Sequence, residues 1–314
     1  MKIRENLSLR TLSAILLGAL MLGPALAQES YIIIDNQTGQ ILEAEKPKEK
    51  LQAASLTKIA TCMVVLDWAN LNQVDLSASV PLSNAAFTNG ASSTVGLQPG
   101  DSTSLRDLMY CALLASDNVA ANALADHVGS RIPNPESLDP IGNFVAQMNA
   151  LARSLFMKRT LFLNPSGMDN MPKGHALPYS TAEDLARLTR HAYNDAAFKF
   201  YVAQPSRVIH VLRNGLDNPI EIKNTNELLG RNDIDGVKTG RTRRAGDCLI
   251  ISAEHPPESH REGDTVMVTP RRISVVLLGS IDRFRDGLQL LNRGWALYDT
   301  WASEGRPTKK GSTL

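Results

Sequence analysis

Tyr31–Asp35 (YIIID) is the first stretch of the chain that specifies a structure, and it decides how the fold can be assembled. Its residues are mostly β-branched, and Asn36–Gly39 (NQTG) follows them with a composition typical of a turn. A second short apolar stretch comes next, at Ile41–Ala44. The pattern predicts a β hairpin at the beginning of the fold.

The segment after this hairpin is predicted to be mainly helical. Ser55–Asn70 begins with a serine and carries a wide apolar face, which is typical of a buried helix. Ser180–Glu183 has the S-x-x-E form of a capping box and predicts another helix start. Leu82–Asp101, rich in Asn, Ser, Gly and Thr, predicts a loop. Further helices are expected at Ser104–Leu114, Val119–Val128 and Ile141–Leu155.

Strand patterns return in the last third of the chain, ahead of a closing helix from about Asp282 to Ala302. The strands are expected at Val208–Leu212, Gly236–Lys238, Cys248–Ala253 and Ile273–Gly279. Because strands stand at both chain ends, we expect an α+β fold with one antiparallel sheet flanked by helices, and a helical part at about residues 60–195 inserted in it. Glu254–Arg272 is predicted as a long hairpin without an assigned function, and residues 306–314 as a polar, solvated tail.

Residues 1–27 have the features of a secretory signal peptide. Basic residues precede an apolar run at Leu12–Leu22, and Ala25–Ala27 ends it as a small-x-small cleavage site. The run is shorter than the roughly 20 residues that a membrane span needs. We therefore expect a mature chain without a transmembrane segment, secreted across the inner membrane into a periplasmic or extracytoplasmic compartment.

The composition excludes several classes of protein. With 33 basic and 32 acidic side chains, the chain lacks the positive excess of a nucleic-acid-binding surface. Three cysteines cannot form a disulfide framework, and neither they nor the six histidines show zinc-ligand spacing. We expect no metal and no cofactor. The cysteines are interpreted as small buried apolar residues, with a Cys62–Cys111 disulfide as a weaker hypothesis.

Ser55 and Lys58 are the first pair that suggests chemistry. Residues three apart on a helix share a face, so the lysine amine can reach the serine hydroxyl and act as its base if it is held neutral. A Ser-x-x-Lys pattern taken alone is expected by chance in a chain of this size. On its own it is better explained as a helix cap followed by a surface lysine.

Two further patterns gain weight only in combination with the first. Ser116-Asp117-Asn118 lies in a predicted turn between helices and can direct a hydroxyl and a carboxamide into one cleft. Lys238-Thr239-Gly240 lies at a predicted strand end, where a cation and a hydroxyl suit a substrate carboxylate and a glycine permits close approach.

The order S-x-x-K, S-x-N, K-T-G is that of class A β-lactamases and penicillin-binding proteins. The chain resembles the serine D-alanyl-D-alanine carboxypeptidases, the low-molecular-mass penicillin-binding proteins, from about Tyr31 to Trp301. The resemblance implies a β-lactamase/transpeptidase-like fold, with residues 28–305 as the catalytic domain. The matching segments are Ala54–Lys58, Asn164–Met168, Ser180–Ala182, Asn224–Asn226, Asp235–Gly240 and Ala245–Leu249.

The resemblance also implies a substrate and a role for each residue. The substrate is the D-Ala-D-Ala terminus of a peptidoglycan stem peptide, and β-lactam antibiotics act as covalent inhibitors. Ser55 is the expected nucleophile, Lys58 its base and Ser116 the proton relay. The expected substrate-binding residues are Asn118, Lys238, Thr239, Gly240 and Arg241, the last through its backbone N–H in an oxyanion hole shared with Ser55.

Two positions depart from the family pattern. Asp117 stands where the family usually has Gly, as in a class A β-lactamase, and Ser166 stands where it usually has His. A β-lactamase also needs a glutamate in an E-x-x-L-N segment, which neither Glu136 nor Glu183 provides. The chain further resembles a short form lacking the C-terminal β domain, which leaves a cross-link-cutting DD-endopeptidase open as an alternative. A β-lactamase and a non-catalytic penicillin-binding sensor are weaker alternatives.

Overall fold

The computed structural model describes the chain from Glu29 to Leu314, except residues 89, 134–138, 171–173, 263–264 and 310. The predicted signal peptide and Glu136 lie outside the described residues. None of the helices in the described part of the chain is long and apolar enough to cross a membrane.

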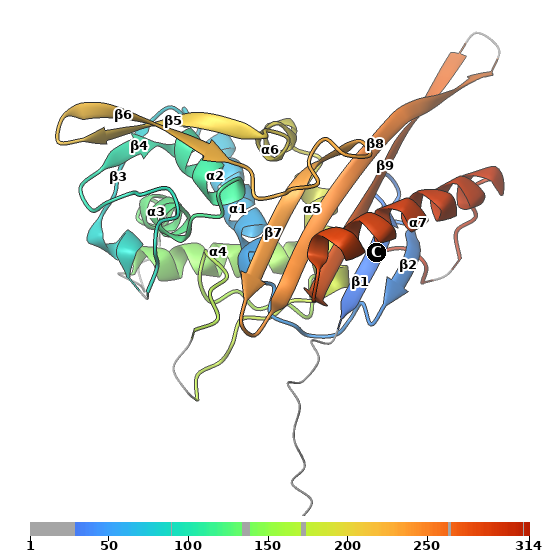
Figure 1. Cartoon of the computed structure of the whole chain (residues 1–314), viewed down its shortest axis with the longest axis horizontal. Coiled ribbons are helices and arrows are strands. Elements are labelled where there is room, and N and C mark those ends of the chain that lie inside the picture. Colours follow the sequence, from blue (N-terminus) through green and yellow to red (C-terminus); the bar gives the residue numbers. More distant parts are fainter. Residues whose placement is uncertain (1–28, 89, 134–138, 171–173, 263–264, 310) are drawn as a thin grey trace, which may run out of the picture.

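The main sheet has five antiparallel strands in the order β2-β1-β9-β8-β7 (Figure 1). They are β1 (Ser30–Asp35), β2 (Ile41–Glu45), β7 (Ile234–Thr242), β8 (Gly246–Glu262) and β9 (Thr265–Ser280). The N-terminal β1 lies beside the C-terminal β9, with Ile32 opposite Val276. The prediction of a sheet built from both chain ends is therefore confirmed.

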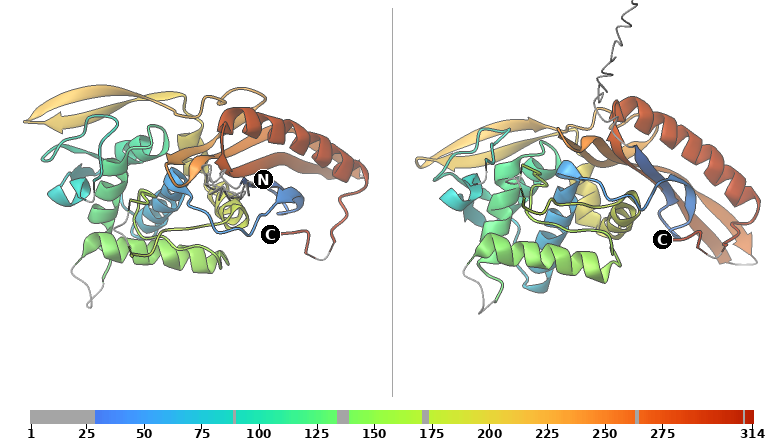
Figure 2. Two further views of the ribbon diagram at one scale, coloured as in Figure 1. Left: turned by 60° about the horizontal axis from the view of Figure 1, so that its bottom comes forward. Right: turned by 90° about the horizontal axis from the view of Figure 1, so that it is seen from below.

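Both faces of this sheet are covered, which explains why the β1 sequence is continuously apolar. Ile33 points toward α7 (Arg283–Ser303), where Gly294 lets the helix approach so closely that a Cβ there would lie 2.8 Å from the isoleucine. Ile32 and Ile34 pack on the other side in the large core shared with α1 (Lys58–Leu71) and α5 (Ala182–Ala192). Figure 2 shows α7 and these helices on opposite faces.

The expected helices are present within one to three residues of their predicted ends. They are α1, α2 (Leu105–Leu113), α3 (Asn118–Gly129), α4 (Pro140–Ser154), α5 and α7. The short helix α6 (Ala196–Val202) and two 3-10 turns, η1 (Ala54–Thr57) and η2 (Asn84–Phe87), were not predicted. The capping box at Ser180 was wrong by one residue, because Ser180 pairs its backbone with Leu51 and Thr181 caps α5.

A second sheet corrects the prediction of a single one. It has the order β3-β4-β5-β6 and consists of β3 (Ser79–Pro81), β4 (Ser102–Ser104), β5 (Ser206–Arg213) and β6 (Leu216–Lys223). The predicted strand Val208–Leu212 belongs here. Its buried residues Ile209 and Val211 face the helical core, whereas the intervening side chains are exposed. The strand is thus covered on one face alone, in contrast to β1 of the main sheet.

The C-terminal tail, predicted to be a polar, solvated end, is mostly exposed, but its last residues bond to the first hairpin. Ile41 donates to the Ser312 carbonyl at 2.7 Å, and Leu314 donates to the Gly39 carbonyl at 3.0 Å. β2 is an edge strand, so backbone groups at its start point away from β1. The tail supplies hydrogen-bond partners for them. Residues 312–314 therefore lie against the first hairpin.

Candidate active site

Ser55 lies in the 3-10 turn η1, immediately before α1. Ala54, which precedes it, has a φ of 48°, a left-handed conformation that a residue with a Cβ adopts at a cost. This bend carries the chain from the buried Ala53 into the helix and presents the serine hydroxyl at its N-terminal end. The predicted helix start at Ser55 is thus a sharper turn than an α-helix provides.

Lys58 is completely buried, and its Nζ has three oxygen neighbours. They are the Ser55 Oγ at 2.9 Å, the Asn118 Oδ1 at 2.8 Å and the Ser166 carbonyl at 2.9 Å. Burial lowers the pKa of Lys58 to about 7, although the negative charge of Asp117 opposes the shift. A neutral amine can donate to Asn118 and Ser166 while its lone pair faces the serine proton.

Ser116 lies in the turn between α2 and α3 with a φ of 59°. Its hydroxyl is partly exposed and makes no hydrogen bond within the described part of the chain. Asn118, the first residue of α3, holds Lys58. Asn118 is therefore bound to Lys58, whereas the Ser116 hydroxyl is available to bind a ligand.

Asp117, between them, has a structural role. Its carboxylate caps α3 by accepting from the Ala120 N–H at 2.7 Å, and it accepts from the Thr94 N–H at 2.6 Å and the Ser93 hydroxyl at 2.7 Å. The side chain is fully buried. Asp117 therefore fastens the preceding loop to the start of α3, which explains an acidic residue here without a β-lactamase function.

Lys238 and Thr239 lie on β7, the edge strand beside η1. Lys238 is buried and donates to the Thr239 carbonyl at 2.9 Å, and burial, with repulsion from Lys58 and Arg283, holds its pKa well below the usual range. The Thr239 hydroxyl lies 2.6 Å from that of Thr225. A carboxylate entering this site would favour the charged form of Lys238.

Gly240 brings the two halves of the site together. A Cβ on this residue would lie 3.0 Å from the Ser55 nitrogen and 3.2 Å from the Ala53 carbonyl oxygen, so only glycine fits comfortably. Arg241, the next residue, points its side chain into solvent toward Asp247. Arg283 of α7 fixes the strand by donating to the Gly240 carbonyl at 3.1 Å.

The loop Asn164–Met168, to which the sequence assigns no role, lies against Lys58. The Asn164 side chain accepts from the Gly167 N–H at 2.7 Å and the Met168 N–H at 3.1 Å, which folds the loop into a tight turn. The turn directs the Ser166 carbonyl at Lys58, whereas the Ser166 hydroxyl turns to Asn164. Since a backbone group makes the contact, the departure from His at this position does not remove it.

All three cysteines are buried free thiols, so the hypothesis of a Cys62–Cys111 disulfide was wrong. Each fills the core as a small apolar residue. Burial raises the pKa of Cys62 to about 12, which keeps it unreactive despite its nearness to the lysines. Among the described residues, no group of three His, Cys, Asp or Glu side chains could hold a metal ion.

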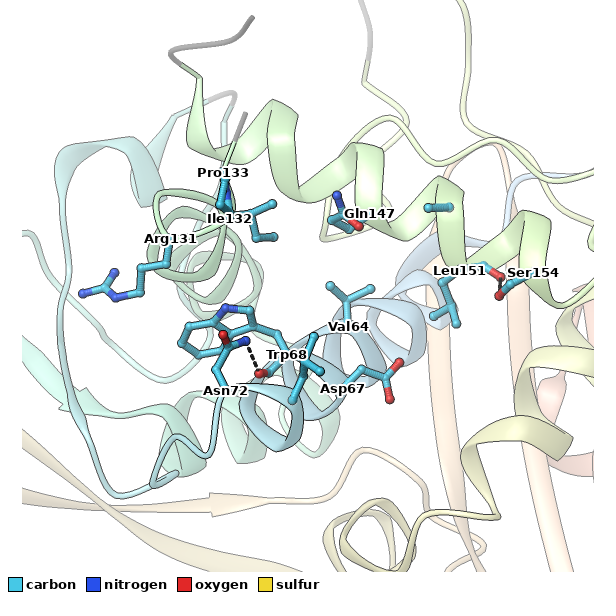
Figure 3. A pocket seen from close by; sticks show the side chains of 12 residues that line it. Val64, Asp67, Trp68, Asn72, Arg131, Ile132, Pro133, Gln147, Leu151 and Ser154 are labelled. Atoms are coloured by element: carbon cyan, nitrogen blue, oxygen red, sulfur yellow. Dashed lines mark hydrogen bonds between the residues drawn. The ribbon is translucent and has the colours of Figure 1, made fainter. Parts of the chain in front are cut away.

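A cavity of about 510 Å³ lies between α1 and α4, near the opposite end of α1 from Ser55 (Figure 3). Val64, Trp68 and Leu151 give it an apolar lining, and Asn72 beside it donates to the Trp68 carbonyl at 2.7 Å. None of the serine and lysine residues described above lines it. The candidate chemistry therefore lies at the junction of η1, α3 and β7.

Comparison with known proteins finds D-alanyl-D-alanine peptidases. A family model described as D-alanyl-D-alanine carboxypeptidase matches residues 20–261. D-alanyl-D-alanine carboxypeptidase DacC of Escherichia coli is 32% identical over 286 residues, which is 88% of this chain and 63% of that protein. A D-alanyl-D-alanine endopeptidase of Pseudomonas aeruginosa is 31% identical over 236 residues, 74% of this chain and 69% of that protein. The chain spans 54% and 64% of the length of two other carboxypeptidase relatives and 89% of a third, from Streptomyces.

Two solved structures share the fold. The Streptomyces K15 DD-transpeptidase superposes with a TM-score of 0.72 and 28% identity, over 87% of this chain and 98% of that one. Penicillin-binding protein D2 from Listeria monocytogenes, in its ampicillin-bound form, gives a TM-score of 0.67 and 25% identity over 87% and 99% of the two chains. The α+β, transpeptidase-like prediction is therefore confirmed.

Proposed function

The chain belongs to the D-alanyl-D-alanine carboxypeptidase family, and from this membership we propose that it is a penicillin-binding serine DD-peptidase. It would hydrolyse the terminal D-Ala-D-Ala bond of peptidoglycan stem peptides, outside the cytoplasm, where this polymer lies. The observation that carries the proposal is the Ser55–Lys58 pair. A serine hydroxyl lies 2.9 Å from a fully buried amine whose pKa is lowered to about 7.

Acylation would begin with proton transfer from Ser55 to Lys58. The serine oxygen then attacks the carbonyl carbon of the penultimate D-alanine and forms a tetrahedral oxyanion. The backbone N–H groups of Ser55 and Arg241 would bind that oxyanion, and the close approach of Gly240 to the Ser55 nitrogen supports this pairing. Once protonated, Lys58 is stabilised by Asn118 and the Ser166 carbonyl.

Collapse of the tetrahedral species would expel the terminal D-alanine. Its amine needs a proton, and Ser116 would relay one, since its hydroxyl is free of partners in the described chain. Lys238 and Thr239 would hold the terminal carboxylate, the first by charge and the second by its hydroxyl. Water then hydrolyses the acyl-enzyme and regenerates Ser55.

β-Lactams would acylate the same serine, and the resulting acyl-enzyme would be hydrolysed slowly. This part of the proposal draws support from the relative whose structure contains ampicillin. Asp117 is occupied by the cap of α3 and the loop before it, and supplies no group to activate a deacylating water. We therefore propose that the protein is inhibited by penicillin and does not destroy it rapidly.

Cleavage of peptidoglycan cross-links is the second candidate. A relative named D-alanyl-D-alanine endopeptidase is 31% identical to this chain, close to the 32% of the E. coli carboxypeptidase. A D-Ala bond within a cross-link presents the same reacting carbonyl, with a longer leaving group. The serine and lysine chemistry is identical for both substrates.

Release of D-alanine from a stem pentapeptide, compared with cleavage of a cross-linked stem-peptide dimer, tests the proposal and separates the two candidates. We expect Ser55→Ala to abolish both activities and labelling by fluorescent penicillin, and a chelator to leave them unchanged. Activity that survives Ser55→Ala would refute the proposal. Labelling by penicillin without turnover of either peptide would instead indicate a non-catalytic sensor.

A further inference from the structure

Strands β8 and β9 continue beyond the main sheet as a two-stranded arm at the upper right of Figure 1, whose described residues are 255–262 and 265–271. On the side of β9 away from β8, β1 pairs only with Ile273–Leu278, and the last backbone bond there runs from the Asn36 N–H to the Arg272 carbonyl. Within the described residues, no strand pairs with β9 on that side from Thr265 to Arg271. The arm therefore presents an open strand edge.

The outer five residues of this edge read the same in both directions. Thr265–Thr269 is TVMVT, centred on Met267. Val266, Met267 and Val268 are 57%, 55% and 58% exposed. Exposed strand edges are usually protected by charge, proline or a bulge. The outer strand of the second sheet, β6, follows that rule with Pro219 and three charged residues. The base of the β9 edge follows it with Pro270 and Arg271, whereas the five outer residues TVMVT contain no charge and no proline.

The base of the arm is held firmly against α7. Arg271 pairs with Asp299 at 2.8 Å, and the His255 ring stacks on Trp295 with ring centroids 3.6 Å apart. Arg306, just beyond α7, pairs with Glu258 at 2.5 Å. A projecting edge that is fixed in this way loses little conformational entropy when it binds.

We propose that this edge pairs with the same edge of a second copy of the chain, antiparallel, about a two-fold axis at Met267. Because the Arg272 carbonyl faces the open side, strand alternation directs the backbone groups of Val268 and Val266 to that side as well. Val266 then exchanges two hydrogen bonds with Val268 of the partner subunit. Met267 lies opposite Met267 of the partner subunit in a non-hydrogen-bonded pair, and Thr265 faces Thr269 of the partner subunit.

The self-complementary sequence favours a second copy of the chain as the binding partner of this edge. A two-fold interface requires the same surface on both subunits, and TVMVT gives valine on valine and methionine on methionine in that register. Five residues per strand bury less than the roughly 1,200 Å² of a stable interface. We therefore expect a weak dimer, with a dissociation constant of about 0.1 mM.

Sedimentation equilibrium on the whole protein tests the inference. We expect Met267→Lys and Met267→Glu each to raise the dissociation constant at least about tenfold, since like charges would lie directly opposite. An equal mixture of the two variants should form a heterodimer more tightly than either variant pairs with itself. Val208→Lys, the same kind of change at a 47% exposed strand position of the second sheet, is the matched control and should leave the dimer intact.

Circular dichroism spectra and thermal unfolding would show that each variant is folded. Three results would overturn the inference: a wild-type chain that stays monomeric up to about 1 mM, a Met267→Lys variant that dimerises like the wild type, or a mixture that forms no heterodimer. None of these readouts depends on peptidase activity, so they are independent of the proposed function.

Discussion

Lys58 is the residue on which the chemistry depends, because its burial decides whether it can act as a base. An exposed lysine has a pKa near 10.5 and is charged at neutral pH, but burial lowers that of Lys58 to about 7. A charged amine cannot accept the Ser55 proton. The fraction of neutral Lys58 rises with pH through about 7 and then saturates.

We therefore predict that the rate constant for acylation by a fluorescent penicillin rises with pH around 7 and is flat above about 8. Below pH 6 it should fall about tenfold per pH unit. Lys58→Arg, which stays charged throughout, should lower it at least about a thousandfold at every pH. A rate that does not change between pH 5 and 8 would contradict the assignment of Lys58 as base.

Asp117 provides a stability test at the same scale. Asp117→Ala removes a helix cap and leaves the buried N–H group of Ala120 and the N–H group of Thr94 without this partner, so we predict a loss of about 3 kcal/mol in the free energy of unfolding. Thr181→Ala removes only the cap of α5 and should cost about 1 kcal/mol. Denaturant unfolding of both variants measures the difference. Equal losses would show that Asp117 is no more than a cap.

At the scale of elements, the turn Asn164–Met168 against η1 is the contact that the sequence did not reveal. Gly167 has a φ of 80°, and a Cβ there would lie 1.9 Å from the Ala54 carbonyl oxygen. The two segments cannot separate without moving the Ser166 carbonyl away from Lys58. The close packing of this turn on η1 therefore keeps the Ser166 carbonyl within hydrogen-bond distance of Lys58.

We predict that Gly167→Ala lowers the free energy of unfolding by more than about 3 kcal/mol and slows penicillin acylation at least about tenfold. Gly215→Ala is the control, since Gly215 has the same φ of 80° but no atom within 4 Å of the added methyl group. It should cost only the backbone strain, about 1 kcal/mol, and leave acylation unchanged. Similar losses in both variants would show that φ, and not the contact with η1, explains the glycine.

The elements themselves were predicted to very different degrees. Helices α1 to α5 and α7 were predictable because their apolar spacing and caps are local. The short strands β3 and β4 have only three residues each, too few for a periodic pattern to emerge. The division into two sheets could not be predicted, because a strand such as β5 carries no local signal for which sheet it joins.

At the scale of the whole molecule, we propose that residues 28–305 form one catalytic domain, with the helical part inserted in the sheet part. The large core supports this proposal, since it joins residues of β1, β8 and β9 to those of α1 to α6. The pairing of β1 with β9 also ties the two ends of the domain together. A domain connected in this way should unfold as one unit.

We predict a single unfolding transition seen alike by probes in both parts. Trp68 on α1 reports on the helices, and Trp295 and Trp301 on α7 report on the sheet. In the Trp68→Phe variant, and in the Trp295→Phe/Trp301→Phe double variant, the remaining fluorescence and the far-ultraviolet ellipticity should change at the same denaturant concentration. Separate midpoints would divide the chain into two domains.

The sequence by itself determined the local features of this protein: the first hairpin, most helices, and a serine and a lysine three residues apart on one face. Through the order of the motifs and the family resemblance, it also indicated Ser116, Asn118 and Lys238 as active-site residues. Only the tertiary structure decided that Lys58 is buried and that the Ser166 carbonyl reaches it. Spacing along a helix is fixed by residues a few positions apart, whereas the desolvation that lowers a pKa is the sum of contacts from segments far apart in the chain.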